Sequence, residues 1–581
     1  MIVIFKNFDT IENKYKAHSF VTHIRKEKER CDMTVYKDYN QISLPNESAD
    51  GYYMNKQKKQ VEEFIYMDPE WYRQLFDANT FYILGPKGSG KTLYAAYMCA
   101  EVRNNTVSKS HTINVDDYGK LIAMKTKNHL NYTDYLTMWK VILMQKLLLG
   151  LDSREISFWG RTKSFQSIQH TISEYFGYDV ADDSFNPVTV IDSCSKQVQV
   201  TEYLNNQVGV GGPKDAQAVS VSSENATEEK TGATVEHLME KSYVVYTDTW
   251  LRSIDAFKKT LEKTTFKYNH FFFVDGLDVR PSHIDAREYA ECIGALVRAV
   301  YDINMKILGN MKRKDNCEFR VIALTRTDIF LNSNLVNVTS CINDNCVELD
   351  WTYSNEKAFV YSKLYKMMNR VLGWNGIDKT MPVEQYFGFK LPYPVKRPLR
   401  ADMYIQRQTR LRPRDVIVLL KLIQKECANR RIANPDVEVL DSTEIFSKYA
   451  NYYTDQIKFE MMFNYSSDEI KSIFGLIKII RKDSFYEDEF KRIYDMYCVE
   501  NEDISRLFKS HRQLIDLFYS LDAIGWVEFF EYSTATHWHY REIKAIDETY
   551  RLPWEQFDSA MKAKFLIHKG ACKHILGTRR K

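Results

Sequence analysis

The chain has 581 residues, of which 44% are hydrophobic and 14% aromatic, so it can bury sizeable cores and is not a disordered polymer. Its 80 basic and 77 acidic residues leave a net charge of +3, which gives no overall signal for nucleic-acid binding and restricts any basic surface to a local one. The ten cysteines are scattered without a Cys-x-x-Cys pair, which favours reduced thiols over a disulfide framework or a zinc site.

The first residues lack a basic segment followed by a long apolar stretch, and no run of about 18 apolar residues occurs anywhere in the chain. We therefore expect no signal peptide, no membrane span and a cytoplasmic location. Residues 1–64 mix charged and polar residues without sustained periodicity and are interpreted as an N-terminal arm. A short helix is expected from Pro69, because Asp68 is a good N-cap and proline suits the first helical position.

The next segment contains the strongest motif of the sequence. The apolar run Phe81–Leu84 predicts a buried strand, and a helix is expected from Thr92 to about Val102. Between them, Gly-x-x-x-x-Gly-Lys-Thr matches a phosphate-binding loop at every required position. Glycines there let backbone N–H groups turn inward toward phosphate oxygens, while the lysine reaches the phosphates and the threonine hydroxyl ligates Mg²⁺. The predicted ATP and Mg²⁺ ligands are Gly85, Pro86, Lys87, Gly88, Ser89, Gly90, Lys91 and Thr92.

A second buried strand is predicted at His270–Val274, and it ends at Asp275. A carboxylate at this strand end can hold the shell of the Mg²⁺ ion, so Asp275 is the second predicted metal residue. The interval between the loop and this strand exceeds what such a core needs, which predicts an insertion at about 110–265. Its Gly/Ser/Glu-rich part, around 205–235, is expected to be mobile or hairpin-like.

The residue after Asp275 is Gly276, whereas hydrolytic proteins with this loop usually carry a glutamate there as the base that activates water. Asp278 is the nearest substitute, and a capping or ion-pairing role with Arg280 is the alternative interpretation. A helix is expected after this turn, over about 284–305.

The third predicted strand, Phe319–Leu324, ends in two polar residues, Thr325 and Arg326. A polar side chain at that position can sense the γ-phosphate, although Arg326 can equally be an exposed charge at a strand end. Val347–Trp351 is a candidate fourth strand. Strands that alternate with helices indicate an α/β fold with a mainly parallel sheet, so residues 65–355 are interpreted as a P-loop ATPase core of the ASCE or AAA-like kind.

Residues 356–465 read as mostly helical and are interpreted as a lid domain. Pro413 fixes the start of a strong helix in this region. One of the three arginines around it can reach the phosphates and stabilise developing charge, or the three can form a solvated basic helix start. These residues are Arg410, Arg412 and Arg414.

Residues 466–581 give three helices followed by two short strands, at Trp526–Phe530 and Trp538–Tyr540, a pattern typical of a winged-helix domain. The last part, Lys562 to Lys581, is basic without an acidic residue. Such a tail can neutralise DNA or RNA phosphates, and a solvated C-terminus explains it equally well.

These motifs resemble known families. Phe272–Asp278, which contains Asp-Gly-Leu-Asp, resembles the signature of KAP-type P-loop NTPases, and Leu324–Arg326 resembles the Thr-Arg strand end of STAND signalling ATPases. The arrangement over about 65–581 resembles poorly characterised prokaryotic and phage P-loop ATPases tied to mobile elements and antiviral defence. Val279 departs from the KAP pattern, which has arginine there, and Arg280 follows one place late. The short motifs cover under a tenth of the chain.

The resemblance implies a nucleotide-dependent switch or assembly platform, with a homo-oligomer and a partner effector protein, and ATP as a trigger more than as a fuel. A DNA-dependent motor or loader of replication or recombination is a second hypothesis, in which the basic tail would grip DNA. A nucleotide-binding scaffold with little hydrolysis is a third, and Gly276 is the feature that suggests it.

Overall fold

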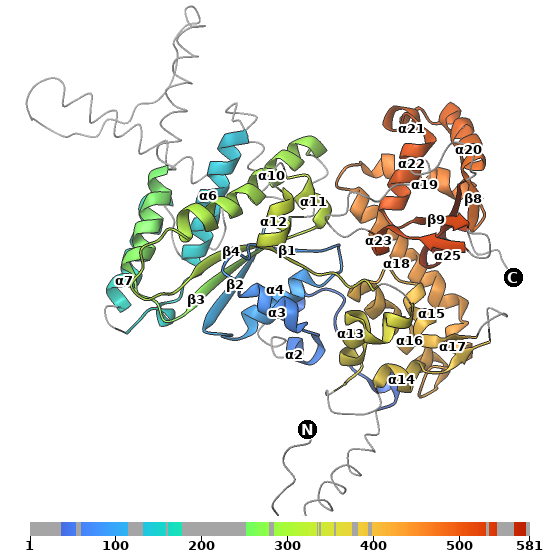
Figure 1. Cartoon of the computed structure of the whole chain (residues 1–581), viewed down its shortest axis with the longest axis horizontal. Helices are drawn as coiled ribbons and strands as arrows, with labels where there is room; N and C mark the ends of the chain where they lie inside the picture. The colour runs from blue at the N-terminus through green and yellow to red at the C-terminus, as the bar shows by residue number, and fades with distance from the viewer. Residues whose placement is uncertain are drawn as a thin grey trace, which may run out of the picture.

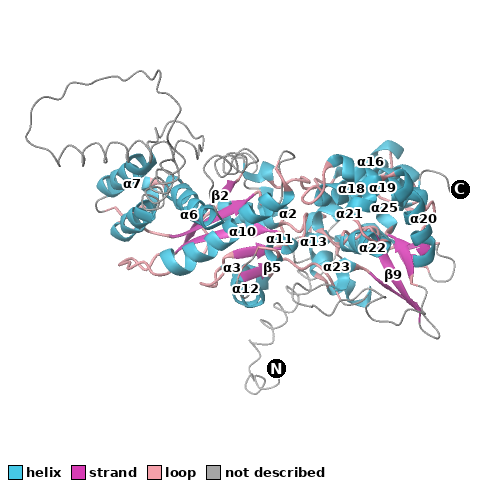
Figure 2. Cartoon of the chain, turned by 90° about the horizontal axis from the view of Figure 1, so that it is seen from above, coloured by secondary structure: helices cyan, strands magenta, loops and turns pink. Residues whose placement is uncertain are grey.

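The computed structural model describes residues 37–53, 60–113, 132–158, 161–176, 251–277, 280, 284–333, 335, 338–353, 356–374, 381–392, 398–529, 534–542 and 563–576. The N-terminal half carries a parallel sheet between helices, and the C-terminal half is mainly helical with a four-stranded and a two-stranded sheet (Figures 1 and 2). Residues 1–36 and the predicted Gly/Ser/Glu-rich stretch at 205–235 lie outside the described residues.

The sheet of the N-terminal half has five strands in the order β2-β3-β4-β1-β5, and every pairing is parallel. The predicted α/β class with a parallel sheet is therefore confirmed. The predicted fourth strand is shorter than expected, because β5 ends before Leu349. The strands are β1 (Tyr82–Leu84), β2 (Thr106–Thr112), β3 (Asn269–Asp275), β4 (Phe319–Thr325) and β5 (Cys346–Glu348).

Alternate residues of the strands enter two separate cores, because successive side chains of a strand point to opposite faces. On β3, Phe271 and Phe273 pack into the core that contains α3 and α4. Phe272 and Val274 pack into the other core, with α6 and α10. Both faces of the sheet are thus covered, as its continuous apolar runs require.

Helix boundaries in this half follow from local sequence. Asp68 caps α3 through hydrogen bonds from the backbone N–H groups of Glu70 and Trp71, as predicted from the Asp-Pro pair. The helix predicted over 284–305 is α10, which continues into a π-helical turn, η4 (Ile303–Leu308). The helices are α2 (Gln60–Phe64), α3 (Pro69–Leu75), α4 (Lys91–Ala100), α6 (Tyr132–Leu149), α7 (Arg161–Phe176), a helix over 251–263, α10 (Ala286–Asp302), α11 (Thr327–Leu331) and α12 (Val338–Asn345).

The helical region that follows packs onto the same core as α3 and α4. Tyr39, from the segment predicted as an arm, is buried there and donates to the carbonyl of Leu420 at 2.9 Å. The elements are η5 (Glu356–Tyr361), α13 (Lys363–Val371), α14 (Pro382–Phe387), β6 (Lys390–Leu391), β7 (Leu399–Arg400), α15 (Ala401–Arg407), α16 (Pro413–Arg430), α17 (Val437–Leu440) and α18 (Thr443–Met461).

The C-terminal region has helices around a four-stranded antiparallel sheet of order β10-β9-β11-β8. The strand predicted at Trp538–Tyr540 is wrong, because β10 ends at His537 and a helix begins at His539. The winged-helix identity of this region stays a prediction. The elements are α19 (Ser467–Ile479), β8 (Ser484–Tyr486), α20 (Glu487–Glu500), α21 (Glu502–Leu507), α22 (His511–Ser520), β9 (Ile524–Phe529), β10 (Thr534–His537), α23 (His539–Glu542), β11 (Lys564–Ile567) and α25 (Lys569–Leu576).

Part of the predicted basic tail is structured. Its described residues form β11 and α25, and α25 lies against α18, where a Cβ on Gly570 would meet Cδ2 of Tyr453 at 2.7 Å. The alternative of a solvated C-terminus is therefore wrong for residues 563–572. Lys562 and residues 577–581 lie outside the described part. Among the described helices, none has the length and the apolar character that crossing a bilayer requires.

Candidate nucleotide-binding site

The loop between β1 and α4 turns through left-handed glycines. Gly88 has φ of 86° and Gly90 has φ of 100°, a region that residues with a Cβ rarely adopt. Gly90 is the N-cap of α4, so the first N–H groups of that helix face the inside of the loop. A helix N-terminus and a turn of inward amides together favour an anion.

Lys91, the first residue of α4, carries its charge to the middle of the loop. The residue is 8% exposed, and its ammonium group donates to the carbonyl oxygens of Gly85 at 2.8 Å and Pro86 at 3.1 Å. A nearly buried cation held by neutral carbonyls is well placed to receive an anionic group. That Lys91 reaches the phosphates stays a prediction.

Thr92 and Asp275, from two elements far apart in sequence, meet beside the loop. The Thr92 hydroxyl donates to Oδ2 of Asp275 at 2.6 Å, and Oδ1 of Asp275 accepts from the N–H of Gly276 at 2.8 Å. Asp275 is the last residue of β3, and Thr92 lies in the first turn of α4. A hydroxyl and a carboxylate in contact are the hard oxygen donors that Mg²⁺ prefers.

A cavity of about 280 Å³ contains these groups. Its polar end is formed by Lys91, Thr92 and Asp275. The rest of its wall consists largely of aromatic and apolar side chains from other parts of the chain. Trp351 closes one side and donates its indole N–H to the carbonyl of Ser89 at 2.8 Å. Wall residues that sequence analysis did not single out are Tyr52, Phe64, Ile65, Tyr66, Trp351, Met367, Val371 and Ile417.

The arginines at the start of α16 have different environments. Arg414 lines the same cavity as Lys91, and its backbone N–H donates to the carbonyl of Gly88 at 3.2 Å. Its side chain donates from Nε to the carbonyl of Glu47 at 3.1 Å. Arg414 thus joins the loop to the N-terminal segment.

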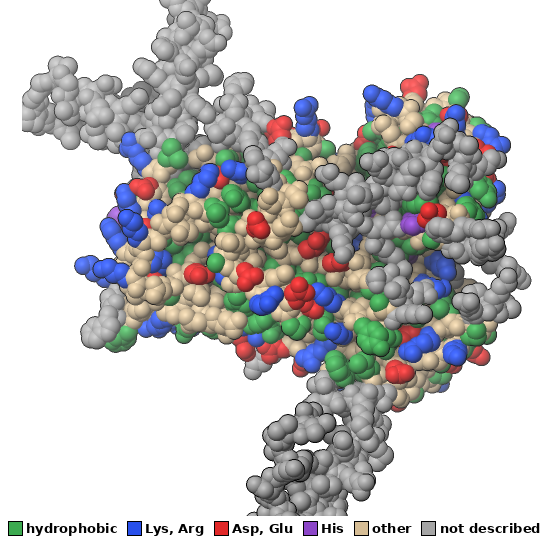
Figure 3. All heavy atoms as spheres, in the orientation of Figure 1, with side chains coloured by type: hydrophobic (Ala, Val, Ile, Leu, Met, Phe, Trp, Pro, Cys, Tyr) green, Lys and Arg blue, Asp and Glu red, His purple; other side chains and the backbone are tan. Residues whose placement is uncertain are grey.

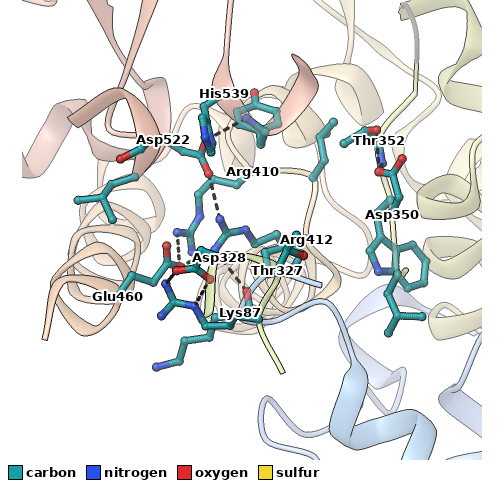
Figure 4. Close-up of a pocket in the computed structure, with 18 of the residues that line it drawn as sticks. Lys87, Thr327, Asp328, Asp350, Thr352, Arg410, Arg412, Glu460, Asp522 and His539 are labelled. Atoms are coloured by element: carbon teal, nitrogen blue, oxygen red, sulfur yellow. Dashed lines mark hydrogen bonds and ion pairs between the residues drawn. The ribbon is translucent and has the colours of Figure 1, made fainter. Parts of the chain in front are cut away.

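Arg410 and Arg412 instead belong to a buried ion-pair network (Figure 4). Arg410 pairs with Asp415 at 3.1 Å and with Glu460 at 3.0 Å. Arg412 pairs with Glu460 at 2.5 Å and with Asp522 at 2.9 Å, and donates to the carbonyl of Lys87 at 3.3 Å. The alternative of a solvated basic helix start is wrong for these two arginines, which are 2% and 6% exposed.

Charge pairing sets the protonation of this network. Burial opposes ionisation of the Glu460 carboxyl, but Arg412, Arg410 and Arg326 outweigh burial and lower its pKa to about 2. Burial likewise opposes the charged form of Asp415, and Arg410 and Arg412 nevertheless lower its pKa. The carboxylates are therefore ionised at neutral pH.

A second cavity, of about 320 Å³, shares Lys87 with the first and is also lined by Arg412 and Glu460 (Figure 4). Arg326 lines this second cavity and donates from Nε to Asp328 at 2.9 Å. Arg326 does not line the cavity that holds Lys91. Thr325 is the last residue of β4 and is paired in register with Leu84 of β1. Within the described residues, its buried hydroxyl has no hydrogen-bond partner.

Asp278, the predicted substitute base, lies outside the described residues. Arg280 does not face the loop and donates from Nε to the carbonyl of Met462 at 3.1 Å. Gly276 is left-handed, with φ of 88°, and a Cβ there would lie 2.3 Å from the carbonyl oxygen of Ile113. The backbone therefore excludes the usual glutamate at this position unless it rearranges.

Gly276→Ala is accordingly expected to destabilise the fold by roughly 1–3 kcal/mol, because both the strained φ and the backbone contact must be relieved. Thermal unfolding checks this expectation. Gly373→Ala is the matched control, since Gly373 has φ of 98° but nothing within 4 Å of its Cβ position. Equal losses for the two variants would show that the Ile113 contact contributes nothing.

No protein-family model, curated protein or solved structure matches this chain.

Proposed function

We propose that the chain is a P-loop ATPase that binds ATP·Mg²⁺ in the cavity formed by the β1–α4 loop. The contact of the Thr92 hydroxyl with the Asp275 carboxylate, at 2.6 Å and in the same cavity as Lys91, carries this proposal. The strand order β2-β3-β4-β1-β5 supports it, because it puts β1 and β3 on either side of β4 with their carboxyl ends at one edge.

Each residue of the site has a role in this proposal. Lys91 and the loop amides neutralise the phosphates, while Thr92 and Asp275 hold the Mg²⁺ ion. The aromatic and apolar wall around Tyr66 and Met367 provides a surface for the base. The bound metal supplies charge neutralisation at the transferred phosphoryl group.

A switch fits the geometry better than a fast motor. Gly276 cannot carry the usual base without backbone movement, so a slow turnover is expected. Arg412 contacts both the carbonyl of Lys87 in the loop and the carboxylate of Asp522 just before β9, so a movement of the loop would be transmitted to the C-terminal sheet. By resemblance, we propose that the nucleotide state controls a homo-oligomer and a partner effector in defence or conflict signalling.

The same observation about Gly276 favours the nucleotide-binding scaffold as a second candidate, in which hydrolysis is negligible. Phosphate release over several hours with purified protein and Mg²⁺ separates the two candidates. Mass photometry with and without a non-hydrolysable ATP analogue then tests the assembly step.

Asp275→Asn provides the direct test of the metal role. Asparagine keeps the shape and one acceptor oxygen but removes the negative charge, so we expect the Mg²⁺-dependent part of ATP affinity to fall about 10- to 100-fold. Titration with a fluorescent ATP analogue, with Mg²⁺ and with a chelator, measures that part. Asp468→Asn, at an exposed position on α19, is the control. Mg²⁺ dependence that survives in Asp275→Asn would contradict the proposed metal site.

A further inference from the structure

Three segments that hydrogen-bond to one another lie at the amino-terminal ends of β3 and β4, at the end of the sheet opposite the nucleotide-binding cavity. They are 152–158, 262–268 and 309–318. The N–H of Lys267 donates to the carbonyl of Glu155 at 2.9 Å. The N–H of Lys312 donates to Glu262 at 3.0 Å, and that of Phe266 donates to Asp315 at 2.6 Å. These contacts join the segments into one continuous surface at the start of β3 and β4.

Four exposed lysines lie on this surface and form no ion pair with any residue in the described ranges. We call them the lysine rim: Lys263, Lys267, Lys312 and Lys314.

The acidic residues nearby are mostly neutralised by other cations. Asp152 pairs with Arg154 at 2.6 Å, Glu155 with Lys109 at 2.8 Å and Asp315 with Arg313 at 2.5 Å. Glu262 is the remaining carboxylate of the three segments near the rim that has no cationic partner in the described part of the chain. The rim therefore keeps an excess of positive charge that its own neighbours do not cancel.

An aromatic side chain accompanies this charge. Phe158, at the end of one of the three segments, is 76% exposed, and the guanidinium of Arg161 lies 5.8 Å from its ring centroid. Figure 3 shows Lys and Arg side chains gathered over the end of the molecule that carries α7. Cations beside an exposed ring are the combination that binds a phosphate backbone and stacks an unpaired base.

We propose that the lysine rim and Phe158 bind single-stranded nucleic acid through its phosphodiester backbone. The surface lies one strand length from Asp275, about 20 Å for a seven-residue strand, so it is separate from the nucleotide-binding cavity. The proposal does not depend on ATP binding. It also differs from the predicted contact through Lys562 to Lys581.

The test is fluorescence anisotropy of labelled 30-nucleotide single-stranded DNA and RNA with the full chain, over about 50–200 mM salt. With about four phosphates neutralised, affinity should fall about 50-fold across this range. The variant K263E/K267E/K312E/K314E should bind at least about 10-fold more weakly at 50 mM salt and lose most of the salt dependence. Phe158→Ala should weaken binding about 5- to 100-fold without changing the salt slope, because it removes stacking only.

A matched control changes the net charge equally on the other half of the molecule. The variant K471E/K478E/K482E/K491E reverses four exposed lysines of the C-terminal region and should keep at least half of the affinity. Equal weakening by both quadruple variants, or binding that both retain, would overturn the proposal. So would binding of the wild type to phosphatidylserine vesicles in the absence of any binding to DNA or RNA. Unchanged melting temperature and ATP-analogue affinity of each variant show that its fold and the nucleotide-binding cavity are intact.

Discussion

Lys91→Ala is expected to weaken ATP·Mg²⁺ binding by at least about 100-fold. The Lys91 ammonium is nearly buried and is held 2.8 Å from the Gly85 carbonyl, so it approaches a phosphate with little loss of hydration or rotational freedom. A charged hydrogen bond in such a place contributes about 3 kcal/mol, which corresponds to about two orders of magnitude in affinity. Isothermal titration calorimetry with a non-hydrolysable analogue measures the loss, and ATP-dependent assembly should disappear with it.

Lys421→Ala is the matched control for this experiment. Lys421 lies on α16 and its ammonium group is 3.8 Å from the Glu47 carboxylate, beside the cavity but not lining it. Its loss removes a nearby positive charge without removing a predicted phosphate ligand, so affinity should change less than about threefold. Full nucleotide affinity in a folded Lys91→Ala protein would reject the proposed site. Equal losses of affinity in the two variants would show that Lys91 acts only through its positive charge near the cavity and not as a phosphate ligand.

The sequence predicted the central strands because their apolar runs are continuous, as burial on both faces of a sheet requires. It missed β2, whose residues Thr106–Thr112 include one aliphatic side chain, Val107. This strand is at the edge of the sheet and pairs with β3 alone, in register from Asn269 to Asp275. Backbone pairing with a strong neighbour therefore formed a strand that side-chain pattern alone does not indicate.

The candidate site likewise has residues that the sequence predicts and residues that it does not. The glycines, Lys91 and Thr92 are local in sequence, so a spacing rule finds them. The cavity walls are not local, because Tyr66 and Met367 reach the loop from segments before and long after it. Apolar residues at such positions carry no motif, since ordinary core packing produces the same residue types.

The three arginines near Pro413 show most clearly what a prediction from sequence alone cannot resolve. The sequence does not distinguish them, because each is a basic residue near a helix start. Their partners decide their roles: Glu460 and Asp522 lie 48 and 110 positions from Arg412. Arg414 has no such carboxylate in its described contacts and lines the cavity.

Glu460→Ala is expected to destabilise the chain by about 3–5 kcal/mol. The variant removes the carboxylate that Arg410 and Arg412 share, so each buried guanidinium loses one ion pair, and breaking a buried ion pair is costly. Urea unfolding followed by tryptophan fluorescence measures the loss. Glu444→Ala is the control, because the Glu444–Lys448 pair on α18 is exposed and its removal should change stability by less than about 1 kcal/mol.

The pH dependence of the same residue provides an independent measurement. The pKa of Glu460 is about 2 in the folded chain, against an ordinary value of 4.5. Its stabilising effect is therefore fully present above about pH 4.5 and is lost as pH falls toward 2, where the folded carboxyl also takes up a proton. The shift corresponds to about 3 kcal/mol.

Glu460→Gln keeps the shape of the side chain and cannot ionise, so its stability difference from the wild type should shrink as pH falls from about 4.5 toward 2. A difference that stays constant over this range would show that Glu460 is not an ionised partner of Arg412. Both variants should also loosen the contact between Arg412 and the carbonyl of Lys87. If the loop and the C-terminal sheet are coupled through Arg412, ATP-driven assembly will weaken in Glu460→Gln more than nucleotide affinity does. Assembly and affinity that fall together would place the coupling elsewhere.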